Sequence, residues 1–542
     1  DGGITLASTA QLTTTAADSD ISMTTGEFGG SLSLGSALVQ AQGANSTVTL
    51  TVVDGAIEQT GGIVSAHSLI ATADNGLSMV GKNADDTNVA VTRFAEVDLT
   101  LERAGELTLF NRGALTLVNV EVADGAIDIA NIGDINVTRA AALGDSDRND
   151  IRLTTYQSGT ITSADISVDT LSTAGRGDVT INAQGTVSRA SAGAADLVAD
   201  VLIIDAMAPI TLNTQVNEAR ITTTRPGHVT LAQSDRRLTL SATQVLDGSL
   251  VVAAQGDVIL DDVTLASNRA VNGLTVTAAG DISLGRVVAG VLLADGDALP
   301  VIEDADGNVL TGLTDVTSAI TVALTSGGQI RESVADAGVD LIADTLEASA
   351  SNGIIDLDVA LNRLDAVTTD GDIRIQDRDG SREASQGLRI LQAVTAQNSD
   401  APVEDTHVEI EAANNIITAA DTEITGDNVR LVSEQGDIQV VAPDAGDSIN
   451  FTQGIGFSAV AGSLDLYRFF TADKSMEYRA GERFLFGSSG AQTSRLPGNM
   501  TSDEIIIQTG GTLSIDGTLT VRDRLELISG ANISVAGDIV AR

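Results

Sequence analysis

The stretch that decides the fold runs from Leu107 to Leu117 and reads LTLFNRGALTL. Apolar residues alternate on both sides of Gly113, which indicates two half-buried strands, because successive side chains of a strand point to opposite faces. A small residue close to a glycine lets the backbone turn sharply between the two strands. The same phrase returns many times along the chain. Its clearest copies are IDIANIGDINV (127–137), VTINAQGTV (179–187), LVVAAQGDVIL (250–260), LTVTAAGDISL (274–284), VEIEAANNII (408–417) and VRLVSEQGDIQV (429–440).

The spacing of these corners predicts a β-solenoid. Neighbouring corner glycines lie about 23 residues apart on average, and a fixed period of roughly 20 to 50 residues is typical of solenoids and repeat arrays. No apolar stripe with a 3.6-residue period is long enough for a helix, and the helical segment of a leucine-rich repeat is missing. We therefore predict an all-β, right-handed parallel β-helix of about 21 coils, with loop insertions at residues 143–150, 294–315 and 376–386.

The alternation also predicts which side chains point into the bore of the helix. With nine Phe, three Tyr and no Trp, the chain has too few rings for a wide core, whereas stacked aliphatic side chains fill a narrow one. The predicted inward residues are Leu109, Ile129, Ile181, Val276 and Ile375. The predicted outward neighbours are Thr108, Asp128 and Thr275.

The charge excludes several classes of function. The chain carries 74 acidic against 30 basic residues, a net charge of −44, and its two lysines are Lys82 and Lys474. Such a surface repels the phosphate backbones of nucleic acids and anionic membranes. We interpret it as a solvated acidic surface suited to an extracellular or salty medium, although it could also gather divalent cations. Cysteine is absent, which excludes disulfides and thiol chemistry.

The sequence contains no apolar run of membrane-spanning length and no basic-plus-apolar leader, so we expect no direct membrane insertion. The chain starts at Asp1 and stops at Arg542 within phrases of the repeat. We interpret it as a mature or excised piece of a longer polypeptide, and we expect its ends to join neighbouring repeats or another copy, because an open β-helix exposes unpaired strand edges.

The repeat phrases LTLFNRGALTL, VTINAQGTV and LTVTAAGDISL resemble the repeat units of filamentous-haemagglutinin-type exoproteins, the large adhesins of bacterial surfaces that are often exported by two-partner secretion. The resemblance covers roughly residues 1–440 and 501–542, and it carries no functional residues to transfer. The N-terminal secretion domain of that family is not recognisable within residues 1–542, so we expect a departure from the family's pattern at this point. The resemblance implies a secreted or surface-anchored fibre, a structural protein for adhesion, scaffolding or aggregation, located outside the cell or on a bacterial cell surface. Its expected partners are further copies or repeats and cell-surface or matrix glycans.

The repeat is least regular at residues 441–500, and we divide the chain into a β-solenoid (1–440), an aromatic-rich insertion or docking segment (441–500) and a solenoid continuation (501–542). A β-helix bore is expected to have no room for the many rings of this segment. Three interpretations stay open, namely a small flap packed on the side of the solenoid, a docking surface, and a carbohydrate site. Aromatic and arginine side chains dominate interface energetics, so the predicted partner contacts are Phe451, Phe457, Tyr467, Phe469, Phe470, Tyr478, Arg479, Phe484 and Phe486.

Two groups of acidic residues are candidates for cation binding. One is the run Asp304, Asp306 and Asn308, which resembles part of a calcium loop but lacks its closing glutamate, and which a hairpin turn explains equally well. The other is a set of aspartates just after the corner glycine, for which acceptance of local backbone N–H bonds at a turn is the alternative to a stacked Ca²⁺ site. Its members are Asp134, Asp178, Asp257, Asp281, Asp372, Asp437 and Asp538.

No residues stand out as catalytic, and no cofactor is expected. His67, His228 and His407 are far apart in the sequence and lie in strand-like segments. Paired carboxylates at the distance that cleaves glycosidic bonds could still meet on neighbouring coils. We therefore expect a protein that is not an enzyme, with a secreted polysaccharide-degrading β-helix enzyme, a lyase or a glycoside hydrolase, as the alternative.

Overall fold

A computed structural model of the chain contains strands and no helix among the residues that it describes. These are residues 2–542 with the exception of 17, 27–29, 81–91, 191–195, 208, 235, 268, 291–301, 304–308, 311–319, 335–337, 379–386, 396–405, 441–448, 460–463, 467–469, 472–474, 481–483, 487–498 and 516. The chain packs as two compact units, residues 1–256 and 257–542. The predicted boundaries at 440 and 500 fall inside the second unit.

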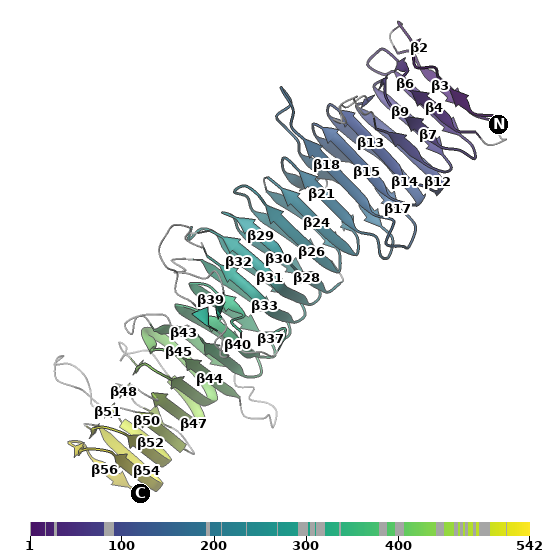
Figure 1. Ribbon diagram of the computed structural model, residues 1–542. Helices are drawn as coiled ribbons and strands as arrows, with labels where there is room; N and C mark the ends of the chain where they lie inside the picture. Colours follow the sequence, from purple (N-terminus) through teal and green to yellow (C-terminus); the bar gives the residue numbers. More distant parts are fainter. Residues whose placement is uncertain are drawn as a thin grey trace. The chain divides into compact units, whose positions relative to one another are not determined.

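The first unit is a stack of short strands (Figure 1). They are β1 (Ile4–Thr5), β2 (Gln11–Thr13), β3 (Ile21–Thr24), β4 (Leu32–Gly35), β5 (Leu38–Gln40), β6 (Thr47–Val52), β7 (Ile57–Gln59), β8 (Ile63–Ser65), β9 (Ser68–Ala73), β10 (Leu77–Met79), β11 (Thr92–Arg93), β12 (Glu96–Ala104), β13 (Leu107–Arg112), β14 (Leu115–Asp124), β15 (Ile127–Ile132), β16 (Ile135–Val137), β17 (Ala140–Ala142), β18 (Ile151–Tyr156), β19 (Ile166–Val168), β20 (Leu171–Thr173), β21 (Val179–Ala183), β22 (Val187–Arg189), β23 (Leu197–Val198), β24 (Val201–Ala206), β25 (Ile210–Gln215), β26 (Glu218–Thr223), β27 (Val229–Gln233), β28 (Leu238–Leu240), β29 (Thr243–Leu246) and β30 (Leu250–Ala254).

The second unit repeats this organisation. Its strands are β31 (Val258–Ala266), β32 (Gly273–Ala278), β33 (Ile282–Ala289), β34 (Ile302–Glu303), β35 (Val309–Leu310), β36 (Thr321–Ser326), β37 (Ile330–Glu332), β38 (Leu341–Ile342), β39 (Thr345–Ala350), β40 (Ile354–Ala360), β41 (Arg363–Thr368), β42 (Ile373–Asp377), β43 (Leu388–Thr395), β44 (His407–Ala412), β45 (Ile416–Ser433), β46 (Ile438–Val440), β47 (Ile449–Ala459), β48 (Leu464–Leu466), β49 (Phe470–Thr471), β50 (Ser475–Ala480), β51 (Phe484–Phe486), β52 (Asn499–Thr509), β53 (Leu513–Ile515), β54 (Thr518–Ser529), β55 (Ile533–Val535) and β56 (Ile539–Ala541).

Strands of successive coils pair in parallel, which confirms the predicted all-β parallel β-helix. In the first unit, β13 pairs with β15, β15 with β18, β18 with β21 and β21 with β24. This register places Leu107, Ile127, Ile151, Val179 and Leu202 one above another, so these coils contain between 20 and 28 residues. The antiparallel pair β34–β35 is a local exception within the predicted insertion at 294–315.

The predicted inward and outward positions are confirmed. Leu109, Ile129, Ile181 and Val276 are fully buried, and Ile375 is 3% exposed. Their neighbours Thr108, Asp128 and Thr275 are half-buried or exposed. Burying one such aliphatic side chain contributes about 1.5–3 kcal/mol, so a column repeated over many coils is the main source of stability.

The coils turn sharply at the corner glycines, as predicted, and a ladder of buried asparagine amides lies beneath these corners. Gly133, with φ of 124°, adopts a backbone conformation that favours glycine, and a Cβ atom there would lie 2.8 Å from the Gly113 carbonyl oxygen. Beneath the corner, the amide of Asn131 donates to the Gly113 and Asp134 carbonyls at 2.7 and 2.8 Å. Asn111, one coil earlier, donates to the Asn131 side chain at 3.2 Å. These buried amides bond the corner carbonyls, which would otherwise lose hydrogen bonds on burial.

The expectation that the bore has no room for the rings of residues 441–500 is wrong for two of them, because the described strands of this segment continue the solenoid. β47 pairs in parallel with β45 and with β50, and β48 pairs with β46 and with β51. Phe457 and Tyr478 are paired in register, buried at 1% and 0% exposure, with ring centroids 5.7 Å apart in an edge-to-face arrangement. The bore therefore holds two stacked rings, because residues one coil apart can pack edge to face.

We predict that stability depends on the phase of the alternation. Ile181→Asp would bury an unpaired carboxylate and should destabilise the fold by about 3–5 kcal/mol. Thr180→Asp places the same group on the outer face of the same strand and should change stability by less than about 1 kcal/mol. Urea unfolding followed by circular dichroism measures both, and equal losses would contradict the assignment of the two faces.

Candidate functional site

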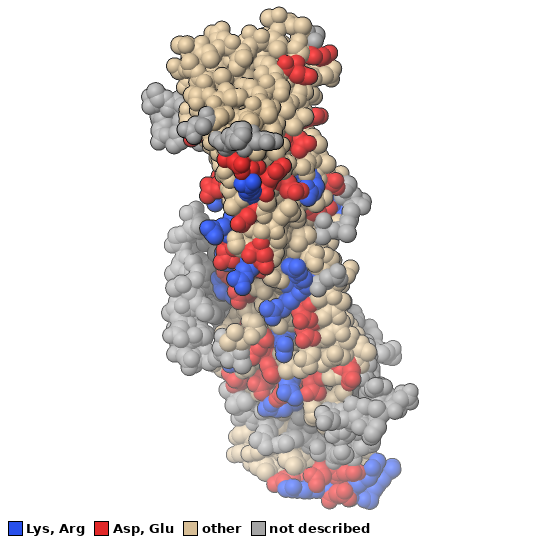
Figure 2. Space-filling model, turned by 90° about the vertical axis from the view of Figure 1, so that its right-hand side faces the viewer, with Lys and Arg blue, Asp and Glu red and all other residues tan. Residues whose placement is uncertain are grey.

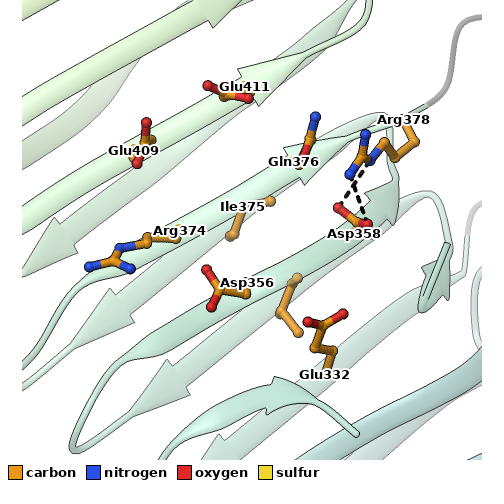
Figure 3. A pocket seen from close by; sticks show the side chains of 10 residues that line it. Glu332, Asp356, Asp358, Arg374, Ile375, Gln376, Arg378, Glu409 and Glu411 are labelled. Carbon is orange, nitrogen blue, oxygen red and sulfur yellow. Dashed lines mark hydrogen bonds and ion pairs between the residues drawn. The ribbon is translucent and has the colours of Figure 1, made fainter. Parts of the chain in front are cut away.

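The surface of the second unit carries a charged depression of about 260 Å³ (Figure 3). Acidic and arginine side chains from four neighbouring strands share its lining. The lining residues are Glu332, Asp356, Leu357, Asp358, Arg374, Ile375, Gln376, Arg378, Glu409 and Glu411.

The parallel register of β40, β42 and β44 brings these residues together. Arg374 pairs with Glu409, and Gln376 lies between Asp358 and Glu411 in the ladder. A β-bulge interrupts β40, because the register shifts between Ile354 and Leu357. Asp356 occupies the bulge with φ of 54°, a conformation that few residues other than glycine, asparagine and aspartate adopt. The bulge leaves the Asp356 side chain exposed at the edge of the depression.

The strongest ion pair of the depression joins Asp358 and Arg378. The Asp358 carboxylate, 8% exposed, accepts two bonds from the Arg378 guanidinium, both at 3.1 Å. Its backbone N–H donates to Asp340 Oδ2 at 3.0 Å. Two parallel bonds fix the planar guanidinium, so this pair is a rigid element of the surface.

Glu409 and Glu411 share a single arginine. Both carboxylates accept a bond from Nη1 of Arg430, at 3.0 Å for Glu411. Partial burial and the nearby carboxylate of Glu434 raise the pKa of Glu411, while Arg378 opposes the shift. Glu409 and Glu411 are two residues apart on β44, so their side chains point to the same face and their Cα atoms are about 7 Å apart.

This geometry allows one proton-transfer arrangement. A glutamic acid with a raised pKa can donate a proton, and a neighbouring ionised carboxylate can serve as its partner in acid–base or nucleophilic chemistry. Most of these charges, however, are already held in ion pairs, Asp358 with Arg378 inside the depression and Arg374, Glu409 and Glu411 with residues beside it. The charged outward positions of DIRIQDR (372–378) and VEIEA (408–412) could have been read from the sequence, but their meeting in one depression could not.

The corner aspartates hold consecutive coils together, which corrects the expectation of local turn bonds. Asp134 Oδ1 accepts the N–H of Asp165 at 2.9 Å, in the next coil. Asp178 accepts from Val201 at 3.1 Å in the same way. Further bonds of this kind join Asp257 to Asp281, Asp281 to Gln329 and Asp372 to His407, at 2.8–2.9 Å. Each of these five carboxylates, of the seven corner aspartates, thus bonds to a backbone group one coil later.

The cation predictions receive no support from these contacts. Asp304, Asp306 and Asn308 lie outside the described residues. Within the described part of the chain, no group of three or more His, Cys, Asp or Glu side chains is arranged to hold a metal ion. His228, one of the three histidines, accepts the N–H of Ser249 at Nδ1, 3.0 Å away.

The predicted partner contacts are only partly described. Phe457 and Tyr478 are buried in the bore and are therefore not accessible contacts, and burial raises the pKa of the Tyr478 phenol. Phe451, Phe470, Arg479, Phe484 and Phe486 lie on strands β47, β49, β50 and β51, and their contact role stays a prediction. Tyr467 and Phe469 lie outside the described residues.

Comparison with known proteins finds no family model, no curated protein and no solved structure that matches this chain. The resemblance to haemagglutinin-type exoproteins therefore stays a prediction. No α-helix of membrane-spanning length and hydropathy occurs in the part of the chain that the structure describes.

Stacked carboxylates make the stability of the fold depend on pH. Glu347 on β39 pairs in register with Asp365 on β41, and partial burial together with the Glu347 charge raises the pKa of Asp365. Burial also raises the pKa of Asp128, Asp178 and Asp196. A carboxyl group with a raised pKa binds its proton more tightly in the folded than in the unfolded chain, so folding becomes more favourable as the pH falls toward the unfolded value near 4.

We predict that the thermal midpoint rises when the pH is lowered from 7 to about 5, because these groups take up protons in the folded state. Asp365→Asn should raise the midpoint at pH 7 and reduce the gain on acidification. Glu58→Gln is the control, since Glu58 is exposed and pairs with Ser33 and Ser78. Calorimetry at pH 7, 6 and 5 measures the effect, and a midpoint that falls over this range would contradict it.

Proposed function

We propose that the chain is a structural protein of an extracellular fibre or a cell-surface adhesin or scaffold. The observation that carries the proposal is the uniform repetition of the coil in both units, with aliphatic columns inside and parallel ladders between coils. Each coil depends on its neighbours for its strand partners, which suits a protein whose length and surface are its function.

The composition supports a location outside the cell or on a bacterial surface. A net charge of −44 with two lysines keeps a repetitive β-protein from associating indiscriminately, because like charges repel. The ion pairs that occupy the charges of the depression also favour a structural role. Its arginines are bound to Asp358 and Asp372 and are not free to hold a polyanionic substrate, while Arg430 binds its two glutamates.

We predict that intact producing cells carry the protein on their exterior. Antibodies against the chain should label intact cells, and immunogold electron microscopy should place the label on fibres or on the cell surface. A cytoplasmic protein of the same cells is the control for leakage. Labelling that appears only after the cells are permeabilised would contradict the proposal.

A second candidate, a secreted polysaccharide-degrading enzyme, is favoured by one observation. Glu411, whose pKa is raised, lies beside Glu409 in the depression, an arrangement that glycoside hydrolysis uses.

We predict no turnover of neutral or anionic glycans, measured by reducing-end and unsaturated-product assays. If turnover occurs, Glu411→Gln decides its origin. The matched control is Glu121→Gln, which removes another glutamate that is paired with an arginine, Arg139, at 2.6 Å. Activity lost in Glu411→Gln and kept in Glu121→Gln would replace the fibre proposal by the enzyme.

A further inference from the structure

One column of outward side chains in the first unit carries no charge over six consecutive coils. The parallel pairings place its members at the same register position on β14, β16, β19, β22, β25 and β27. We call this column the neutral stripe, and it consists of Thr116, Asn136, Ser167, Ser188, Thr211 and Thr230.

The column continues at both ends of the neutral stripe. Val251, 36% exposed, follows Thr230. Glu96, the one charged member, precedes Thr116 and is itself preceded by Ser68 and Thr47. The column thus spans ten coils of the first unit with a single carboxylate.

The surroundings of the neutral stripe are also largely uncharged on its later coils. Asn213, Ala232 and Ala253 are in register beside it. The charged neighbours lie mainly on the earlier coils, where Asp134 is two residues before Asn136, and Asp165 and Asp169 flank Ser167. The Asp134 and Asp165 carboxylates each accept an N–H of the next coil. On the later coils, Arg189 bonds to the Asn213 side chain at 3.2 Å.

The other sheet of the same coils carries charges in its outward columns. Asp128 on β15 is paired with Arg152 on β18, and Arg220 on β26 follows in the same column after the uncharged Thr180 and Ile203. Asp205 on β24 lies in the neighbouring column, after Asn182. Charged side chains are also uncommon on the viewed face of the N-terminal coils, at the top of Figure 2. The first 81 residues contain no Lys or Arg.

We propose that the neutral stripe is the docking surface for a second copy of this chain. Two chains of charge −44 repel each other, so close approach requires a face where carboxylates do not meet. A two-fold axis would place the neutral stripe of one copy against that of the other, because such an interface uses the same patch twice. Within the described residues, the hydroxyls of Ser188, Thr211 and Thr230 have no hydrogen-bond partner in the chain, which leaves them available to a second copy.

The size of the column predicts a weak and reversible contact. The six coils of the neutral stripe, at about 4.8 Å each, give a length of roughly 29 Å, and with a width of about 13 Å each copy would bury roughly 375 Å². The total of roughly 750 Å² is below the range of standard specific interfaces and is that of a transient contact. The neutral stripe also lacks the aromatic rings that usually stack on sugars, so a second copy suits it better than a glycan.

This inference deepens the proposed fibre role and rests on it, since it names how copies associate side by side. Its central test is sedimentation velocity of the full chain at about 0.05 M and about 0.5 M NaCl. Because salt screens the repulsion between acidic chains, association should increase with salt. A wild-type chain that stays monomeric at both salt concentrations would overturn the inference.

Ser188→Glu combined with Thr230→Glu adds two charges to the neutral stripe and should weaken self-association by about tenfold or more. The matched control, Thr154→Glu with Thr180→Glu, adds the same charge to β18 and β21 on the charged sheet and should leave association within about twofold of the wild type. Circular dichroism and thermal midpoints establish that each variant is folded. Equal effects of the two pairs, or no effect of the first, would overturn the inference.

A second measurement does not depend on added charge. The chain has no cysteine, so the single variants Ser188→Cys, Thr211→Cys and Thr230→Cys report proximity through a bis-maleimide cross-linker. At least one should form covalent dimers faster than Thr180→Cys, and no difference would overturn the inference. Binding of an uncharged glucan by a monomeric wild type, lost on adding the Glu pair, would assign the neutral stripe to a saccharide instead.

These outcomes are distinguishable from failure of the proposed function. Immunogold labelling tests where the protein acts, whereas sedimentation and cross-linking test which face joins two copies. A surface-located protein whose neutral stripe is inert would keep the fibre proposal and overturn the docking inference alone.

Discussion

The interaction on which the structure depends is the parallel backbone ladder between successive coils. It stacks each residue about 4.8 Å from its counterpart in the next coil, so each chemical group meets the group at the same position one coil later. Aliphatic groups such as Leu109 and Ile129 form the bore, and buried amides such as Asn111 and Asn131 bond to each other and to the corners. The same rule makes identical charges costly, because it brings them together.

The carboxylates of the chain are stabilised or accommodated in three ways, each of which follows from the stacking of equivalent positions. Corner carboxylates such as Asp178 accept an N–H of the following coil. Others are bound by arginines, as Asp358 is by Arg378 in a largely buried pair. A few are stacked on another acid, as Asp365 is on Glu347, and their pKa values rise. Where none of these solutions is used, an outward column can carry hydroxyl or amide groups instead, as the neutral stripe does over six coils.

The charged depression has the residue types of a catalytic site, but its charged side chains are held in ion pairs, as is typical of a structural surface. Arg430 binds both Glu409 and Glu411, and Arg378 is fixed on Asp358. An arginine held by two protein carboxylates contributes little to binding an anionic sugar, because its charge is already compensated. The raised pKa of Glu411 keeps the enzymatic alternative open to a direct assay, while the repetition of the coil remains the main support for a fibre.

The class of fold, the corners and the two faces of each strand could be predicted from the amino-acid sequence alone. The reason is that these are local properties: alternation sets the faces, and glycine near a small residue sets the turn at Gly113 and Gly133. Which residues stack could not be predicted in this way. Coil lengths vary between 20 and 28 residues even among regular coils, so the register of distant segments cannot be counted along the chain. The folded chain was needed to reveal that Phe457 meets Tyr478 inside the bore, that acids and arginines converge on one depression, and that six uncharged residues align in one column, because each of these depends on the pairing of whole coils.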